Sequence, residues 1–290
     1  MAHAGPLAVA ASIAPIQSLV AGVMGEVGTP ALLIPGGQSP HTFSLRPSTV
    51  RAIARADLIF RISPDFELAL DAPLAASRGA RIVDLIDTAG VTTYPSRDLG
   101  EIGETAERAA SERVPGGDRD PHIWLDPDNA RAMARTIAAT LAEADPSEAS
   151  AYRANEALVE QWLTALDSAM KDELAPVRAR PFVVFHDGYQ YFERHYRLQF
   201  ADAVTEFPGR SPGALHILKV REEIKSAHAS CVFGEAQFEP RLLKTVTEGL
   251  AVRTEVLDPL GADLAPGPAL YFDVMRGLSH AFVSCLSPAT

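Results

Sequence analysis

The sequence predicts an α/β protein of two lobes, each with a mostly parallel sheet, joined by one long rigid helix. Short apolar runs alternate with segments of helical periodicity over residues 7–86, and the same alternation recurs over residues 181–286. Such alternation is typical of strands and helices that build a parallel sheet. Between the two regions, residues 147–175 contain no Gly or Pro and favour one uninterrupted helix.

The first lobe is expected to contain four strands. They are predicted within residues 7–16, 31–37, 58–63 and 80–86, the first running into a helix and the second ending in a Pro-Gly-Gly turn. Residues 47–58 have apolar side chains at helical spacing, and Ser48 is the expected cap. Residues 94–120 are polar, charged and rich in Gly, which favours an exposed loop. A helix over residues 129–145 then ends at an Asp-Pro pair.

The long helix and the second lobe follow. At 1.5 Å per residue the helix would span about 40 Å, and its apolar positions at i, i+3, i+4 spacing are Tyr152, Leu158, Trp162, Leu163, Leu166 and Met170. Strands are expected within residues 181–186, 198–205, 229–235 and 252–257, and helices within 187–196, 213–228, 239–251 and 268–286. The predicted domains are residues 1–145, the linking helix 146–176, and residues 177–290.

Composition and charge exclude several classes of protein. The net charge of −11, without a basic cluster, argues against nucleic acid as a partner. No apolar run approaches the ~20 residues of a membrane helix. The N-terminus, MAHAGPLAVAASIAPI, lacks the basic start and long apolar middle of a secretory signal. We therefore expect either a cytosolic protein or one whose signal peptide has been removed.

The redox state of the two cysteines would indicate the cellular compartment of the protein. Cys231 and Cys285 lie in apolar surroundings and are too far apart for a CxxC zinc or redox motif. Two interpretations stay open from the residues alone, namely reduced buried thiols or a disulfide. A disulfide would place the protein outside the cytosol.

Four polar residues lie just past a predicted strand or in a loop next to one, where sheets of this kind bind their ligands. They are His41, His122, His186 and Asp258. Three imidazoles and a carboxylate suit a tetrahedral zinc ion at about 2.0–2.2 Å, and nitrogen ligands favour zinc over magnesium or calcium. The competing interpretation is that each histidine is a packed or capping residue and that Asp258-Pro259 begins a turn.

The stretch DPHIWLDPDNA restricts His122 by a proline on either side, and Asp128 or Asn129 is expected to cap the helix that follows. A carboxylate that accepts the N–H of a ligand imidazole would fix its tautomer. The candidates for this role are Glu206, Glu235, Asp187 and Asp126. The aromatic residues expected to pack around the site and keep it dry are Phe43, Trp124 and Tyr189.

The segments SPHTFSLRPS, DPHIWLDPDNA, FHDGYQYF and EVLDPLG occur in this order. Together they closely resemble the zinc-specific solute-binding proteins of ABC transporters, the ZnuA-like members of the TroA-type (cluster A-I) family. The resemblance runs from about residue 7 to the C-terminus. It implies a metal site in the cleft between two lobes, with His41, His122 and His186 as ligands and Asp258 as the carboxylate ligand. It also implies a Cys231–Cys285 disulfide.

Within the family that the chain resembles, zinc-type and manganese-type members differ at the third ligand position. Manganese-type members tend to have Glu where this chain has His186, so the residue favours zinc. Two departures from the zinc-type pattern are present. Residues 94–120 contain no histidine, so a metal-scavenging loop is not supported, and Pro40 stands where some members have a Glu ligand.

The expected function is that of a periplasmic or otherwise extracytoplasmic receptor, not an enzyme. It would bind Zn²⁺ as a monomer and deliver it to the membrane permease subunits of an ABC importer, with a zinc chaperone as a further partner. One alternative is a receptor or adhesin of the same family for manganese or another divalent metal. Another is a zinc-dependent hydrolase with Glu206 or Glu235 as base, although the chain has no HExxH or GxSxG motif.

Overall fold

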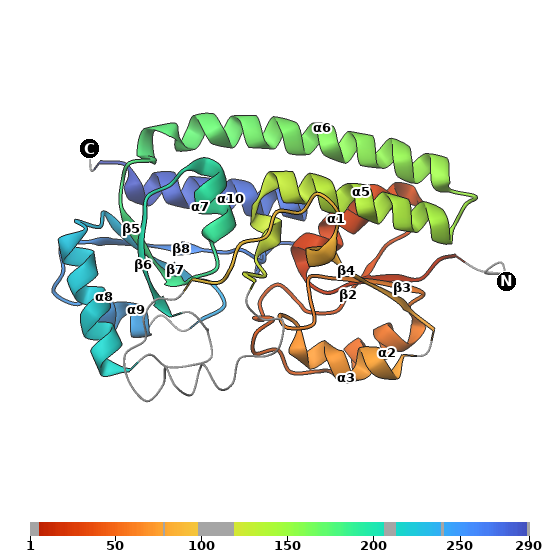
Figure 1. Ribbon diagram of the computed structural model, residues 1–290, viewed down its shortest axis with the longest axis horizontal. Helices are drawn as coiled ribbons and strands as arrows, with labels where there is room; N and C mark the ends of the chain where they lie inside the picture. The colour runs from red at the N-terminus through yellow and green to blue at the C-terminus, as the bar shows by residue number, and fades with distance from the viewer. Residues whose placement is uncertain (1–5, 78, 98–118, 206–212, 239–240, 289–290) are drawn as a thin grey trace. The chain divides into compact units, whose positions relative to one another are not determined.

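The computed structural model describes residues 6–77, 79–97, 119–205, 213–238 and 241–288. Contacts divide the chain into two compact units. The first contains residues 1–92, 123–168 and 260–275, and the second contains residues 93–122, 169–259 and 276–290. The chain thus passes between the two units several times (Figure 1). The division of the sequence into consecutive domains with boundaries near residues 145 and 176 stays a prediction.

The first unit contains a parallel sheet in the order β2-β1-β3-β4. Its strands are β1 (Val9–Ala11), β2 (Ala31–Leu32), β3 (Leu58–Arg61) and β4 (Arg81–Asp84). Its helices are α1 (Ala14–Met24), α2 (Pro47–Arg55), α3 (Leu68–Ala76) and α5 (Pro127–Ala144). The four predicted strands are confirmed, whereas α3 is an element that the sequence pattern did not indicate.

The helix caps differ from those predicted. Asp126 caps α5, because its side chain accepts the N–H of Asp128 and Pro127 occupies the first turn. Asn129 instead bridges the chain to Thr92, donating to its carbonyl at 2.9 Å and accepting its N–H at 2.7 Å. At α2 the N-cap is Arg46 and not Ser48, because Pro47 begins the helix.

The long helix α6 runs from Ala149 to Leu174, as the sequence predicted, and contributes residues to both units. Its buried face differs from the predicted one, because Leu158 and Trp162 are 43% and 49% exposed. The buried apolar positions repeat at intervals of three, four or seven residues and are Tyr152, Val159, Leu163, Leu166, Met170 and Leu174.

The second unit contains another parallel sheet, in the order β6-β5-β7-β8. Its strands are β5 (Phe182–His186), β6 (Phe200–Thr205), β7 (Cys231–Glu235) and β8 (Arg253–Leu257). The helices are α7 (Gln190–Tyr196), α8 (Ala214–Ser226), α9 (Arg241–Thr247) and α10 (Leu270–Leu286), the last shared with the first unit.

The two central strands of the second sheet, β5 and β7, are buried on both faces, which explains why they are almost wholly apolar. On one face Val183 and Val232 belong to a cluster with Val220 of α8. On the other, the ring of Phe282 from α10 lies 5.1 Å from Phe182 and 4.6 Å from Phe233, measured between centroids. Figure 1 shows α8 and α9 on one side of this sheet and α10 on the other. This packing fixes the carboxyl ends of β5 and β7, where the site is built.

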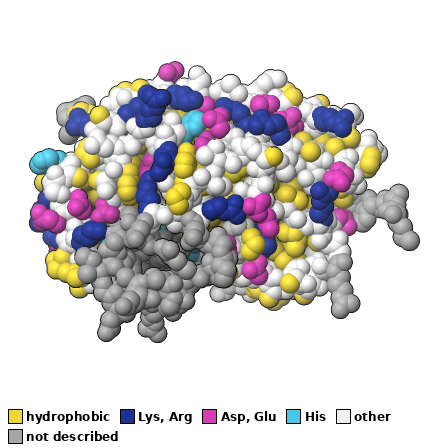
Figure 2. Space-filling model, viewed as in Figure 1, with side chains coloured by type: hydrophobic (Ala, Val, Ile, Leu, Met, Phe, Trp, Pro, Cys, Tyr) yellow, Lys and Arg dark blue, Asp and Glu magenta, His cyan; other side chains and the backbone are white. Residues whose placement is uncertain are grey.

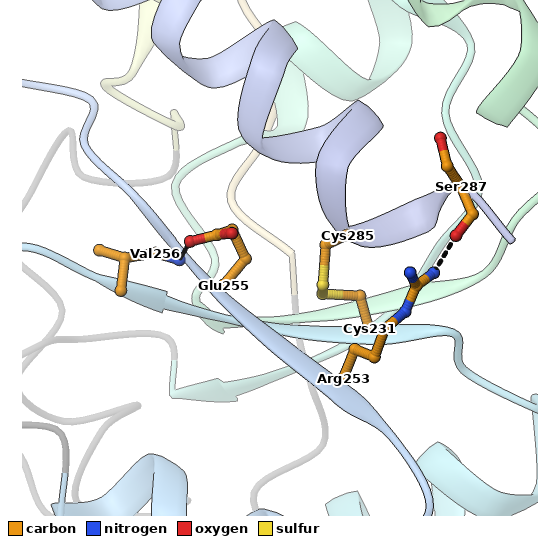
Figure 3. Close-up of a disulfide and its surroundings, with 6 residues drawn as sticks. All are labelled: Cys231, Arg253, Glu255, Val256, Cys285 and Ser287. Carbon is orange, nitrogen blue, oxygen red and sulfur yellow. Dashed lines mark hydrogen bonds between the residues drawn. A yellow bond between two sulfur atoms is a disulfide. The ribbon is translucent and has the colours of Figure 1, made fainter. Parts of the chain in front are cut away.

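A disulfide joins the second sheet to α10. Cys231 at the start of β7 is bonded to Cys285, and their Cα atoms lie 5.9 Å apart (Figure 3). The disulfide implied by the family resemblance is therefore confirmed. Next to it, the guanidinium of Arg253 on β8 donates to the carbonyl of Ser287, which also ties the end of α10 to the sheet.

Charged side chains of both signs are scattered over the face shown in Figure 2, with Lys and Arg lying among Asp and Glu. Within the described part of the chain, no helix combines the length and apolar character needed to cross a membrane.

Candidate metal centre

The second sheet places two polar residues side by side at its carboxyl edge. His186 is the last residue of β5, and Glu235 is the last residue of the adjacent strand β7. The strand order reverses between these two strands, because β6 and β7 lie on opposite sides of β5. Such a switch point is where open parallel sheets bind ligands. Asp258 follows β8, the next strand along the same edge.

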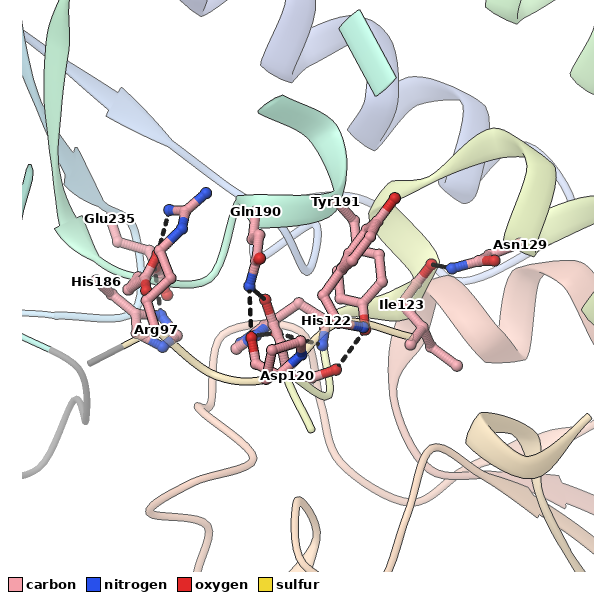
Figure 4. A network of polar contacts seen from close by, with 12 residues as sticks. Arg97, Asp120, His122, Ile123, Asn129, His186, Gln190, Tyr191 and Glu235 are labelled. Carbon is pink, nitrogen blue, oxygen red and sulfur yellow. Dashed lines mark hydrogen bonds and ion pairs between the residues drawn. The ribbon is translucent and has the colours of Figure 1, made fainter. Parts of the chain in front are cut away.

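His186 is held by a carboxylate. Its Nδ1 lies 3.2 Å from Glu235 Oε2 (Figure 4). The hydroxyl of Tyr189 donates to the same oxygen at 3.0 Å. Burial and the charge of Glu235 together raise the pKa of Tyr189 well above its usual value, so the hydroxyl keeps its proton and acts as a donor. With Nδ1 engaged by Glu235, Nε2 is the ring nitrogen that suits a metal ion.

His122 is held in the same way by Asp120. Asp120 Oδ1 accepts the backbone N–H of His122 at 3.0 Å and lies 2.7 Å from its Nδ1. Gln190 at the start of α7 donates to the other carboxylate oxygen at 3.1 Å. Burial by itself would raise the pKa of Asp120, but its charge interaction and hydrogen bonds with His122 outweigh burial and lower it. Asp120 is thus an anion that fixes the imidazole (Figure 4).

The imidazole rings of His122 and His186 lie next to each other. The ring centroids of His122 and His186 lie 4.9 Å apart, and one ligand nitrogen of each lies within 4.8 Å of the other. Their exposed fractions are only 5% and 3%. A Cβ added to Gly188 would lie 3.1 Å from His122 Nε2 and 3.0 Å from His186 Nδ1, so both rings border the same small space. Two buried imidazoles, each oriented by a carboxylate, are donors of the kind that zinc prefers.

A buried ion-pair cluster lies next to the histidine pair. Arg97 is 2.7 Å from Asp187 Oδ1, also pairs with Glu193, and stacks over the ring of Phe200 at 3.9 Å. Burial raises the pKa of Glu193 to about 7, although the neighbouring Arg97 opposes the shift. Asp187, a predicted partner for an imidazole, is therefore bonded to a guanidinium in this structure.

Asp258 is half-buried, and its Oδ1 accepts a hydrogen bond of 2.8 Å from Gln237 Nε2. Gln237 lies two residues beyond Glu235, on the segment that follows β7. The ligand role of Asp258 stays a prediction. Glu206 lies outside the described residues.

The remaining predicted site residues belong to the first unit. His41 follows β2, and its ring packs edge-on against Phe66 with centroids 4.9 Å apart. Phe66 in turn packs against Trp124 at 5.5 Å, and Phe43 is buried. Asp126 caps α5. The part of His41 as third ligand stays a prediction.

Sequence reasoning missed several residues of this centre, among them Asp120, Gln190, Arg97 and Gln237. Only Asp120 has a local signal, because it stands two residues before His122 in the Asp-Pro-His segment and shares its turn. Gln190 lies 70 residues along the chain from its partner Asp120. Arg97 lies 90 residues from its partner Asp187.

Parallel α/β units with a carboxylate-held histidine pair beside a strand switch point fit a class of proteins, the metal-binding receptors among the solute-binding proteins. The chain belongs, within this class, to the ZnuA family, described as the periplasmic component A of a zinc-uptake complex. The family's sequence profile matches residues 9–285.

Named relatives agree with this family. A high-affinity zinc uptake system protein ZnuA from Brucella suis is 40% identical, with 96% of this chain and 91% of the relative covered. The protein of the same name from Paracoccus denitrificans is 35% identical, with 93% of this chain and 89% of the relative covered. A crystal structure of ZnuA superposes with a TM-score of 0.80 at 27% identity, covering 98% of this chain and all of that chain. The expected family and fold class are therefore confirmed.

Proposed function

We propose that this protein binds Zn²⁺ outside the cytoplasmic membrane and delivers it to the permease subunits of an ABC importer. The observation that carries the proposal is the convergence of His122 and His186, each with its Nδ1 held by a buried carboxylate. His41 is proposed as the third nitrogen ligand. Family membership supports the cargo and the periplasmic location.

The chemistry of the centre fits a cargo site. An ion bound mainly by neutral imidazoles follows the affinity order in which zinc exceeds manganese. Asp120 and Glu235 increase the basicity of the two imidazoles without being ligands themselves. No bond of a substrate is made or broken, and the protein acts as a monomeric carrier. A zinc chaperone is a further proposed partner.

Isothermal titration with Zn²⁺ tests the proposal. His122→Ala, His186→Ala and His41→Ala should each weaken binding at least about 100-fold, because each removes a ligand. His280→Ala is the matched control, since His280 is exposed on α10, and it should bind like the wild type. Wild-type affinity in the His122→Ala protein would contradict the proposal.

A further inference from the structure

We propose that Glu67 is a positioning residue for metal binding, because it closes the turn that carries Phe66, and Phe66 in turn holds the imidazole of His41. The inference rests on the proposed function, in which His41 is the third nitrogen ligand, and deepens it. All three residues belong to the first unit. Glu67 is not itself a ligand, and it acts on the ion only through Phe66 and His41.

The turn lies directly beyond the carboxyl end of β3. Glu67 reaches back across it, and its two carboxylate oxygens accept the N–H groups of Ile62 at 3.1 Å and Ser63 at 3.0 Å. The hydroxyl of Ser63 accepts the N–H of Phe66 at 3.3 Å in return. These reciprocal bonds resemble a capping box, which fixes the chain where it enters a helix, here α3. The backbone of Phe66 is therefore held on both sides.

The ring of Phe66 is the part of this turn that faces a candidate ligand. It is only 3% exposed, and it packs edge-on against His41 with an angle of 88° between the ring planes and centroids 4.9 Å apart. The buried ring of Trp124 lies 5.5 Å from the same phenyl ring. Aromatic rings prefer edge-to-face packing, and such a contact favours one ring orientation over others. Because His41 lies on the loop between β2 and α2, its direction depends on contacts of this kind.

The burial of Glu67 needs an explanation other than a charge pair. Its exposed fraction is 0%, and burial raises its pKa to about 7, although the nearby charge of Arg61 opposes the shift. The guanidinium of Arg61 is bonded instead to Asp84 and Asp71, each at 2.6 Å. A buried carboxyl group costs stability, and such costs are expected where function requires the group. The competing explanation is that Glu67 only folds the turn, which predicts no effect that depends on His41.

A double-variant cycle separates the two explanations. Isothermal titration with Zn²⁺ compares the full chain with Glu67→Gln, His41→Ala and the double variant. Glu67→Gln should weaken binding roughly tenfold, which is within the range of an edge-on ring contact. In the His41→Ala protein the same substitution should change the affinity by less than about twofold, because the residue through which Glu67 acts is gone. Glu143→Gln is the matched control, since Glu143 is exposed in the same unit, and it should bind zinc like the wild type.

Phe66→Leu keeps the inference testable if Glu67→Gln does not fold. Leucine leaves the hydrogen bonds of the turn in place but removes the ring edge, so zinc binding should again weaken roughly tenfold. Wild-type affinity in either single variant would overturn the inference, and so would an equal loss from Glu67→Gln with and without His41. Failure of the proposed ligand role shows differently, as wild-type zinc binding by His41→Ala.

Discussion

Glu235 Oε2 lies 3.2 Å from His186 Nδ1 and accepts the Tyr189 hydroxyl at 3.0 Å, so one carboxylate oxygen orients the imidazole. Glu235→Gln removes the charge that supports the Nδ1–H tautomer. We expect zinc affinity to fall about 10- to 100-fold, the usual effect of losing such a partner. Isothermal titration measures it, with Glu222→Gln on the exposed face of α8 as control. Equal affinities of the two variants would show that Glu235 does not act on the site.

The Cys231–Cys285 disulfide should contribute strongly to stability. It joins residues 54 positions apart, and the chain-entropy relation gives about 4 kcal/mol for a loop of that length. We therefore expect the Cys231→Ala/Cys285→Ala protein to lose about 4 kcal/mol in the free energy of unfolding, measured by denaturant titration. Adding a reductant should lower the stability of the wild type and leave the double variant unchanged. A loss below about 1 kcal/mol would contradict the entropic account.

Arg97 should stabilise the second unit through its two carboxylate partners. Arg97→Met would leave Asp187 and Glu193 buried without their counter-charge. Breaking a buried pair in this way costs about 3–5 kcal/mol. Arg81→Met is the matched control, because the pair of Arg81 with Glu143 is exposed and should contribute less than about 1 kcal/mol. Similar losses in the two variants, measured by urea unfolding, would refute the assignment.

Glu67 should make the stability of the protein depend on pH. It is fully buried, it accepts the N–H groups of Ile62 and Ser63, and burial raises its pKa to about 7 from the ordinary 4.5. The folded state therefore holds this proton more tightly than the unfolded state. The stabilisation is fully present below pH 4.5 and is lost as the pH rises through 7.

The expected size of this loss follows from the shift. Between pH 5 and pH 8 the contribution of Glu67 should fall by about 2–3 kcal/mol. The measurement is the difference in unfolding free energy between the wild type and Glu67→Gln at each pH, which cancels the groups that both proteins share. A difference that stays constant between pH 5 and pH 8 would mean that Glu67 titrates normally.

The sequence predicted the strands well because parallel strands covered on both faces are nearly continuous apolar runs, as Phe182–His186 shows. It missed α3, which contains Pro73, a residue that normally ends or kinks a helix. It also assigned Trp162 to the buried face of α6, although the ring is half exposed. Apolar character alone does not tell a residue at the edge of a buried stripe from one inside it.

The sequence pointed to the two histidines that converge in the structure, and less well to the residues around them. His186 follows an apolar strand and His122 stands between two Asp-Pro pairs, and both are local patterns. The partners of these histidines depend on tertiary contacts. Asp120 lies close in sequence, but its bond with Gln190 and the bond of Gln237 with Asp258 depend on folded loops. The periodicity of a sequence carries no information about such loops.

An anomalous-scattering map of the zinc-loaded protein at the zinc absorption edge tests most directly whether the three histidines bind the ion. We expect a single strong peak with nitrogens of His41, His122 and His186 about 2.0–2.1 Å away. A peak bound by other residues, or by fewer than these three imidazoles, would contradict it.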